Sequence, residues 1–69
     1  MFDPVKEVEW VLSQFDKSEQ QKDRFFYLGQ LACLRWIILK EKLETSEFRV
    51  SLNCAYWDRA KRLGVIVER

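Results

Sequence analysis

The feature that most constrains this chain is the segment from Phe25 to Leu39, which is apolar on nearly every side when it is drawn as a helix. A helix on the surface of a globular domain needs one apolar stripe, whereas a helix that is apolar all round needs neighbours on every side. In a chain of 69 residues, little sequence remains to surround such a helix. The segment therefore predicts association, either with a second copy of the chain or with a different protein.

The size of the chain points the same way. A domain this small buries roughly 60% of its unfolded surface and is marginally stable, so small domains often rely on disulfides, a metal or oligomerisation. Cys33 and Cys54 allow at most one intrachain bridge, and without histidine they make a poor zinc site, which needs four ligands. We therefore expect one domain over residues 1–69, without a metal or other cofactor, that forms a homodimer, most simply with two-fold symmetry.

The apolar spacing predicts an all-α fold in which two shorter helices pack around a long central helix and the chain self-associates through that central helix. We expect the helices over residues 4–15, 19 to 43 or 44, and 47–63. A competing interpretation makes residues 48–52 an edge strand, because apolar and polar residues alternate there. The helical pattern explains more residues over a longer window and is preferred. We expect an extended tail over residues 65–67.

Residues with known roles at helix ends support these boundaries. Asp3 before a proline is typical of a helix start. Ser18, with a glutamine three residues later, fits a capping box for the central helix. Thr45 is the next capping candidate, and Gly64 is suited to stop the third helix. Gly29 is expected to mark the close approach of another backbone, with a merely tolerated glycine as the alternative.

The central helix carries three apolar rows. The first row, expected in the core and including Trp36, is Phe25, Leu28, Ala32, Trp36, Leu39 and Leu43. The second row, assigned to self-association, is Tyr27, Leu31, Leu34 and Ile38. The third row, assigned to partner binding, is Phe26, Cys33 and Ile37.

Two further aromatic residues are candidates for partner binding. Trp10 and Trp57 fall off the main apolar face of their helices. Such residues are either covered by a chain terminus or form an interface, where tryptophan contributes much of the binding energy. The simplest expectation for Cys33 and Cys54 is that each is a small buried apolar residue, with a regulatory disulfide as the alternative.

A membrane span is not favoured. At 1.5 Å per residue, the apolar segment reaches about 22 Å against a hydrocarbon core of about 30 Å. It also contains Gln30 and Arg35. The N-terminus lacks a basic stretch followed by an apolar run, as a signal peptide would have. We therefore expect a cytoplasmic protein.

Catalysis is also not expected. Without histidine, the chain cannot build a Ser-His or Cys-His nucleophile. Its two glycines, Gly29 and Gly64, cannot form a glycine-rich phosphate loop. The paired carboxylates are neighbours on helix surfaces, where a solvated role is usual. We therefore expect that the protein is not an enzyme.

The C-terminal part raises DNA binding as an alternative. Residues 1–23 carry three basic and six acidic residues, a net charge of −3, whereas residues 24–69 carry nine and five, a net charge of +4. The stretch from Tyr56 to Arg69, a basic helix that ends in Leu-Gly before apolar residues, resembles the junction between recognition helix and wing in winged-helix regulators. It departs from them by ending where the wing hairpin would begin, and on this stretch alone we assign no family.

That resemblance implies roles for five polar residues. The residues that would face the groove of DNA are Arg49, Asn53 and Arg59. Those that would contact phosphates are Lys61 and Arg62. Because Arg59 lies on the expected core face, these residues do not form one stripe.

The favoured function is therefore a small cytoplasmic protein–protein interaction module. It would act by binding another macromolecule, as a regulator, adaptor or inhibitor, and its size and composition suggest a bacterial or phage type. The first alternative is a DNA-binding transcriptional regulator. The second is a structural subunit of a larger assembly, in which the apolar excess reflects permanent burial.

Overall fold

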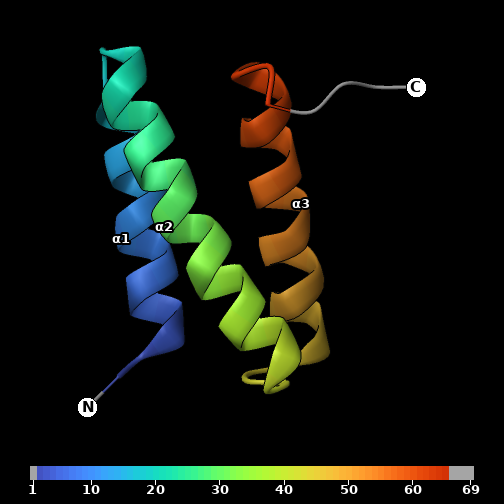
Figure 1. The fold of residues 1–69 in the computed structure, drawn as a ribbon. Coiled ribbons are helices and arrows are strands. Elements are labelled where there is room, and N and C mark those ends of the chain that lie inside the picture. The colour runs from blue at the N-terminus through green and yellow to red at the C-terminus, as the bar shows by residue number, and fades with distance from the viewer. Residues whose placement is uncertain (1, 66–69) are drawn as a thin grey trace.

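Three helices make up the part of the chain that the computed structural model describes, residues 2–65 (Figure 1). They are α1 (Pro4–Lys17), α2 (Gln21–Lys40) and α3 (Ser46–Arg62). The central helix α2 packs against both neighbours and runs antiparallel to them. The predicted all-α fold, with two shorter helices around a long one, is confirmed.

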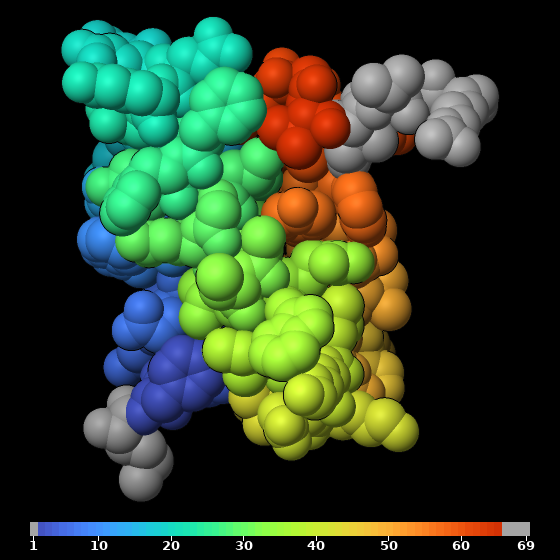
Figure 2. Space-filling model, in the orientation of Figure 1, coloured from blue at the N-terminus to red at the C-terminus, as the bar shows by residue number. Residues whose placement is uncertain are grey.

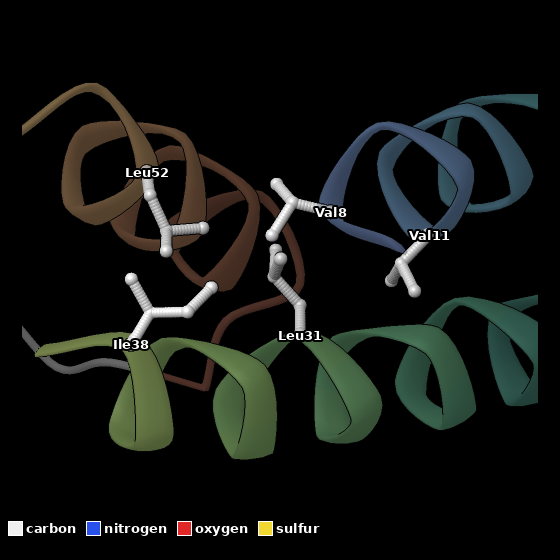
Figure 3. Close-up of a cluster of buried hydrophobic side chains, with 5 residues drawn as sticks. All are labelled: Val8, Val11, Leu31, Ile38 and Leu52. Carbon is white, nitrogen blue, oxygen red and sulfur yellow. The ribbon is translucent and has the colours of Figure 1, made fainter. Parts of the chain in front are cut away.

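The helices form two layers. The Cα atoms span 31 × 30 × 15 Å, and the short dimension suits two helices in depth. Figure 3 shows Leu31 and Ile38 pointing from α2 toward Val8 and Val11 of α1 and toward Leu52 of α3. Helices α1 and α3 therefore cover the same side of α2, and they leave its opposite side uncovered.

The core consists of two clusters of buried apolar side chains. The larger cluster contains Val8, Val11, Leu31, Ile38 and Leu52, each at most 2% exposed. The smaller cluster contains Phe15, Leu28 and Ala60, from the C-terminal parts of α1 and α3 and the first half of α2. Tyr27 and Tyr56 pack against both clusters and so join them.

The predicted helix ends are largely confirmed. A side-chain oxygen of Asp3 accepts a hydrogen bond from the Lys6 amide at 3.3 Å, and the Thr45 hydroxyl accepts one from the Phe48 amide at 3.1 Å. Gly64 has a φ of 73°, in the left-handed region that glycine adopts without strain. Its amide and that of the next residue donate to carbonyls in the last turn of α3, as in a Schellman motif.

The predicted capping box at Ser18 is wrong. Gln20 precedes α2, and its side chain makes no capping hydrogen bond. Ser18 instead terminates α1, because its amide and its hydroxyl both donate to the Gln14 carbonyl, the hydroxyl at 2.7 Å. Its own carbonyl accepts a hydrogen bond from Arg24 at 2.8 Å. The serine therefore belongs to the turn between the two helices, and α1 is longer than predicted.

Helix α2 ends at Lys40, before the predicted 43 or 44. Lys42 and Glu44 both have positive φ values, 52° and 62°, which stop the helix. Arg49 holds the following loop by donating to the carbonyls of Leu43 at 3.1 Å and Glu44 at 2.7 Å. Residues 48–52 are helical, so the alternative strand is wrong. The predicted tail over 65–67 lies mostly outside the described residues.

Candidate protein-docking face

The uncovered side of α2 carries a continuous set of apolar and small residues, which we call the outer face. Its members are Phe25, Phe26, Gly29, Cys33, Trp36 and Ile37. Its four large apolar side chains remain 44%, 59%, 59% and 39% exposed, in chain order. Figure 2 shows α2 lying across the front of the molecule, with this side open to solvent.

The self-association row lies on the opposite, inner side of α2. Leu31 and Ile38 are completely buried, and Tyr27 and Leu34 pack against the same cluster. The assignment of this row to self-association is therefore wrong, because α1 and α3 of the same chain already cover it. The third row, assigned to partner binding, is the one left exposed.

The residues of the row predicted to form the core are divided between the inner and outer sides of α2. Leu28 is buried, but Phe25 and Trp36 belong to the outer face, so the expectation that Trp36 is buried is wrong. The ammonium of Lys40 lies 4.4 Å from the centre of the Trp36 ring, in a cation–π contact. This lysine covers part of the ring and leaves the rest accessible.

Aromatic contacts extend the outer face toward α1. The rings of Phe26 and Tyr27 meet edge to face with centroids 5.2 Å apart, and Tyr27 meets Trp10 of α1 in the same way at 6.0 Å. Trp10 is 51% exposed, as expected for a residue off the main face of its helix. Together these rings form a continuous aromatic surface across two helices.

On the α3 side, Trp57 is held by polar contacts. The guanidinium of Arg35 lies 5.0 Å from the Tyr56 ring centre and 5.1 Å from that of Trp57. The Asn53 side-chain oxygen accepts hydrogen bonds from Arg35 at 2.8 Å and from the Trp57 indole at 3.0 Å. Trp57 is 38% exposed. These contacts make it a brace between α2 and α3 whose outer edge is still accessible.

An open groove of about 490 Å³ lies beside this brace, between α2 and α3. It is lined by Arg35, Leu39, Ser46, Arg49, Val50 and Asn53. The groove forms only where two separate helices come together, close to the loop that joins them, so local sequence patterns do not predict it. The resemblance to winged-helix regulators named two of its lining residues, Arg49 and Asn53, as candidates for contacting DNA, and the exposed Val50 also lines it.

The expectations for the cysteines and for Gly29 also change. Cys33 and Cys54 are free and exposed, so their prediction as buried residues is wrong. Each lies on the side of its helix that faces away from the core. A Cβ atom added at Gly29 would meet nothing within 4 Å. Among residues 2–65, no backbone from outside its own helical turns approaches this glycine.

The basic residues proposed for DNA binding are largely engaged within the chain. Arg49 donates hydrogen bonds to two carbonyl groups of the α2–α3 loop. Arg59 forms an ion pair with Asp16 at 2.9 Å and Arg62 forms one with Asp58 at 3.1 Å. The side chain of Arg59 is only 15% exposed. These contacts leave no continuous basic face on α3.

Comparisons with other proteins do not assign the chain to a family. Within residues 2–65 there is no group of three or more candidate metal ligands. None of the helices found there combines the length and the hydropathy that crossing a membrane requires. No protein-family model, curated protein or solved structure matches the chain.

Proposed function

We propose that this protein is a small protein–protein interaction module, which acts by binding rather than by catalysis, and that the outer face of α2 is its docking surface. The observation that supports this most directly is the exposure of Phe25, Phe26, Trp36 and Ile37 along one side of one helix. A contiguous apolar patch of several hundred Å² is often functional in a monomeric domain.

The composition of the outer face supports the same function. Tryptophan and other aromatic residues dominate binding energy at protein interfaces, whereas acidic residues are depleted there. Residues 24–39 contain no aspartate or glutamate. The neighbouring contact of Trp10 with Tyr27 adds a rigid aromatic rim to the face. These properties favour a protein partner over a nucleic acid.

We further propose a cytoplasmic role as a regulator, adaptor or inhibitor. Cys33 and Cys54 are both exposed as free thiols, and exposed free thiols persist in reducing compartments. The engagement of Arg49 and Arg59 in contacts within the chain counts against the DNA-binding alternative.

Site-specific photocrosslinking in the native cells tests the docking surface. A benzoylphenylalanine residue at position 26 or 36 should form an adduct with a protein, because it replaces an aromatic side chain that contacts the partner. Position 51 provides the control, since Ser51 is exposed on α3, away from the outer face. Adducts that are absent at positions 26 and 36, or equally abundant at 51, would contradict the proposal.

A further inference from the structure

We infer that the occupant of the outer face is a second copy of this chain, bound with the two α2 helices antiparallel about a two-fold axis near the level of Leu31. The inference rests on the proposed function, because it names the partner of the same face. The predicted self-association row of α2 is buried in the core, so we assign self-association to the outer face instead.

The residues of the outer face are arranged symmetrically about that level. Phe26 and Trp36 lie equally far from position 31 along the helix, as do Phe25 and Ile37, and as do Gly29 and Cys33. A two-fold interface uses the same patch on both copies. An antiparallel pair centred at this level therefore brings large residues opposite large residues and small opposite small.

Helical geometry refines these pairs. At 100° per residue, Phe26 and Ile37 lie toward α1, whereas Phe25 and Trp36 lie toward α3. The contact of Phe26 with Tyr27, which in turn touches Trp10 of α1, agrees with this placement. The two-fold rotation places the side of α2 that lies toward α1 next to the same side of the second copy, and does likewise for the side that lies toward α3. Phe26 then packs beside Ile37 of the second copy, and Phe25 packs beside Trp36 of the second copy.

Gly29 supports a close approach of two helices. A glycine in a helix interior destabilises the helix relative to alanine, and within residues 2–65 the space beside Gly29 is empty. Cys33 lies one helical turn later, so the middle of the outer face carries only small side chains and is flanked on both ends by large ones. This shape lets a second helix approach to the usual interaxial distance of about 8–10 Å or less.

The available area is sufficient for a weak but specific dimer. Aromatic side chains can each bury about 150–250 Å², so Phe25, Phe26 and Trp36 at their observed exposures offer roughly 350 Å². Ile37, Cys33 and the aliphatic parts of flanking lysines bring the face to about 600 Å² per copy. This is the lower end of the size range for specific interfaces.

The ends of the face carry like charges that identify the register. Lys22 and Lys40 lie on the outer side of α2, at opposite ends of the apolar residues. The antiparallel register brings Lys22 opposite Lys40 of the second copy, whereas a parallel register brings each lysine opposite its own equivalent. The repulsion is small because these ends lie in water, but reversing the charge at position 22 turns it into attraction only in the antiparallel register, since in the parallel register two like charges still face each other.

Sedimentation equilibrium at low ionic strength tests the proposal. We expect the purified wild-type chain to dimerise, and Lys22→Glu to tighten the dimer roughly three- to tenfold, since it creates two opposite-charge pairs. Lys22→Glu with Lys40→Glu should return the affinity toward the wild-type value. The control Lys6→Glu makes the same change in net charge on α1, away from the face, and should have no comparable effect.

Gly29→Ala provides a second test, because it should change the stability of the monomer and the affinity of the dimer in opposite directions. It should stabilise the helix of the monomer but weaken the dimer at least threefold, because the added methyl group separates the two helices. Ser51→Ala on α3 is the matched control and should leave dimerisation unchanged. Circular dichroism verifies that every variant is helical.

The outcomes separate this inference from the proposed function. A monomeric wild-type chain at high micromolar concentration, together with adducts to another protein at positions 26 and 36, would overturn the dimer and keep the interaction module. A monomer without adducts would overturn both. A dimer that Lys22→Glu does not tighten would overturn the antiparallel register.

Discussion

At the scale of single residues, side chains on the two sides of α2 should differ sharply in their contribution to stability. Leu31 is completely buried, so Leu31→Ala should lower the free energy of unfolding by about 2–5 kcal/mol. Trp10→Ala should cost far less, about 0.5–1.5 kcal/mol from its ring contact with Tyr27. Urea denaturation monitored by circular dichroism measures both changes.

A smaller change in the same cluster provides the control for this comparison. Ile38→Val removes one methylene from a completely buried side chain and should cost about 0.5–1.5 kcal/mol. Equal losses for Leu31→Ala and Trp10→Ala would place Trp10 in the core and remove it from the rim of the docking face.

At the scale of elements, the end of α2 contains a conformation that its residue disfavours. Lys42 has a φ of 52°, and a side chain in the left-handed region costs about 1 kcal/mol or more. Lys42→Gly should therefore stabilise the protein by about 0.5–1 kcal/mol, after the greater freedom of glycine in the unfolded chain is subtracted. Thermal and urea unfolding both measure this gain.

A glycine inside the helix provides the comparison for the loop variant. Gln30→Gly should destabilise by about 1 kcal/mol, because it weakens the interior of α2 without relieving any strain. A loss of stability for Lys42→Gly would contradict the prediction, because it would show that the left-handed conformation of Lys42 does not carry this cost.

At the scale of the whole molecule, the two core clusters should unfold together. Tyr27 and Tyr56 pack against both clusters, and a domain of this size usually unfolds in one cooperative step. Each helix carries one tryptophan, namely Trp10, Trp36 and Trp57. In each of three variants that retain only one of them, the urea transition followed by fluorescence should coincide with the transition of the same variant followed by circular dichroism, at low protein concentration. A transition that separates one helix from the other two would contradict this.

Much of the fold was predictable from local sequence, since a helix is stabilised by hydrogen bonds between residues near each other in the chain. Asp3 and Thr45 form caps with amides three residues away, and Gly64 terminates α3 within one turn. The same local reasoning failed at Ser18, where two different helix ends compete for one serine.

The candidate site was predicted only in part. The sequence pattern assigned Phe26, Cys33 and Ile37 to partner binding, and the structure leaves these residues exposed. It assigned Trp36 to the core and Leu31 to self-association, whereas the structure exposes Trp36 and buries Leu31. Hydrophobicity could not separate these residues, because α2 is apolar on almost every side.

The sequence by itself determined three helices, their approximate ends and an excess of apolar surface on the central one. Only the tertiary structure decided which side of α2 became the interior, because that choice depends on where α1 and α3 pack. Both cover the side of Leu31 and Ile38. The physical reason is that local hydrogen bonds specify a helix, whereas its orientation is selected by contacts between side chains that are distant in the chain.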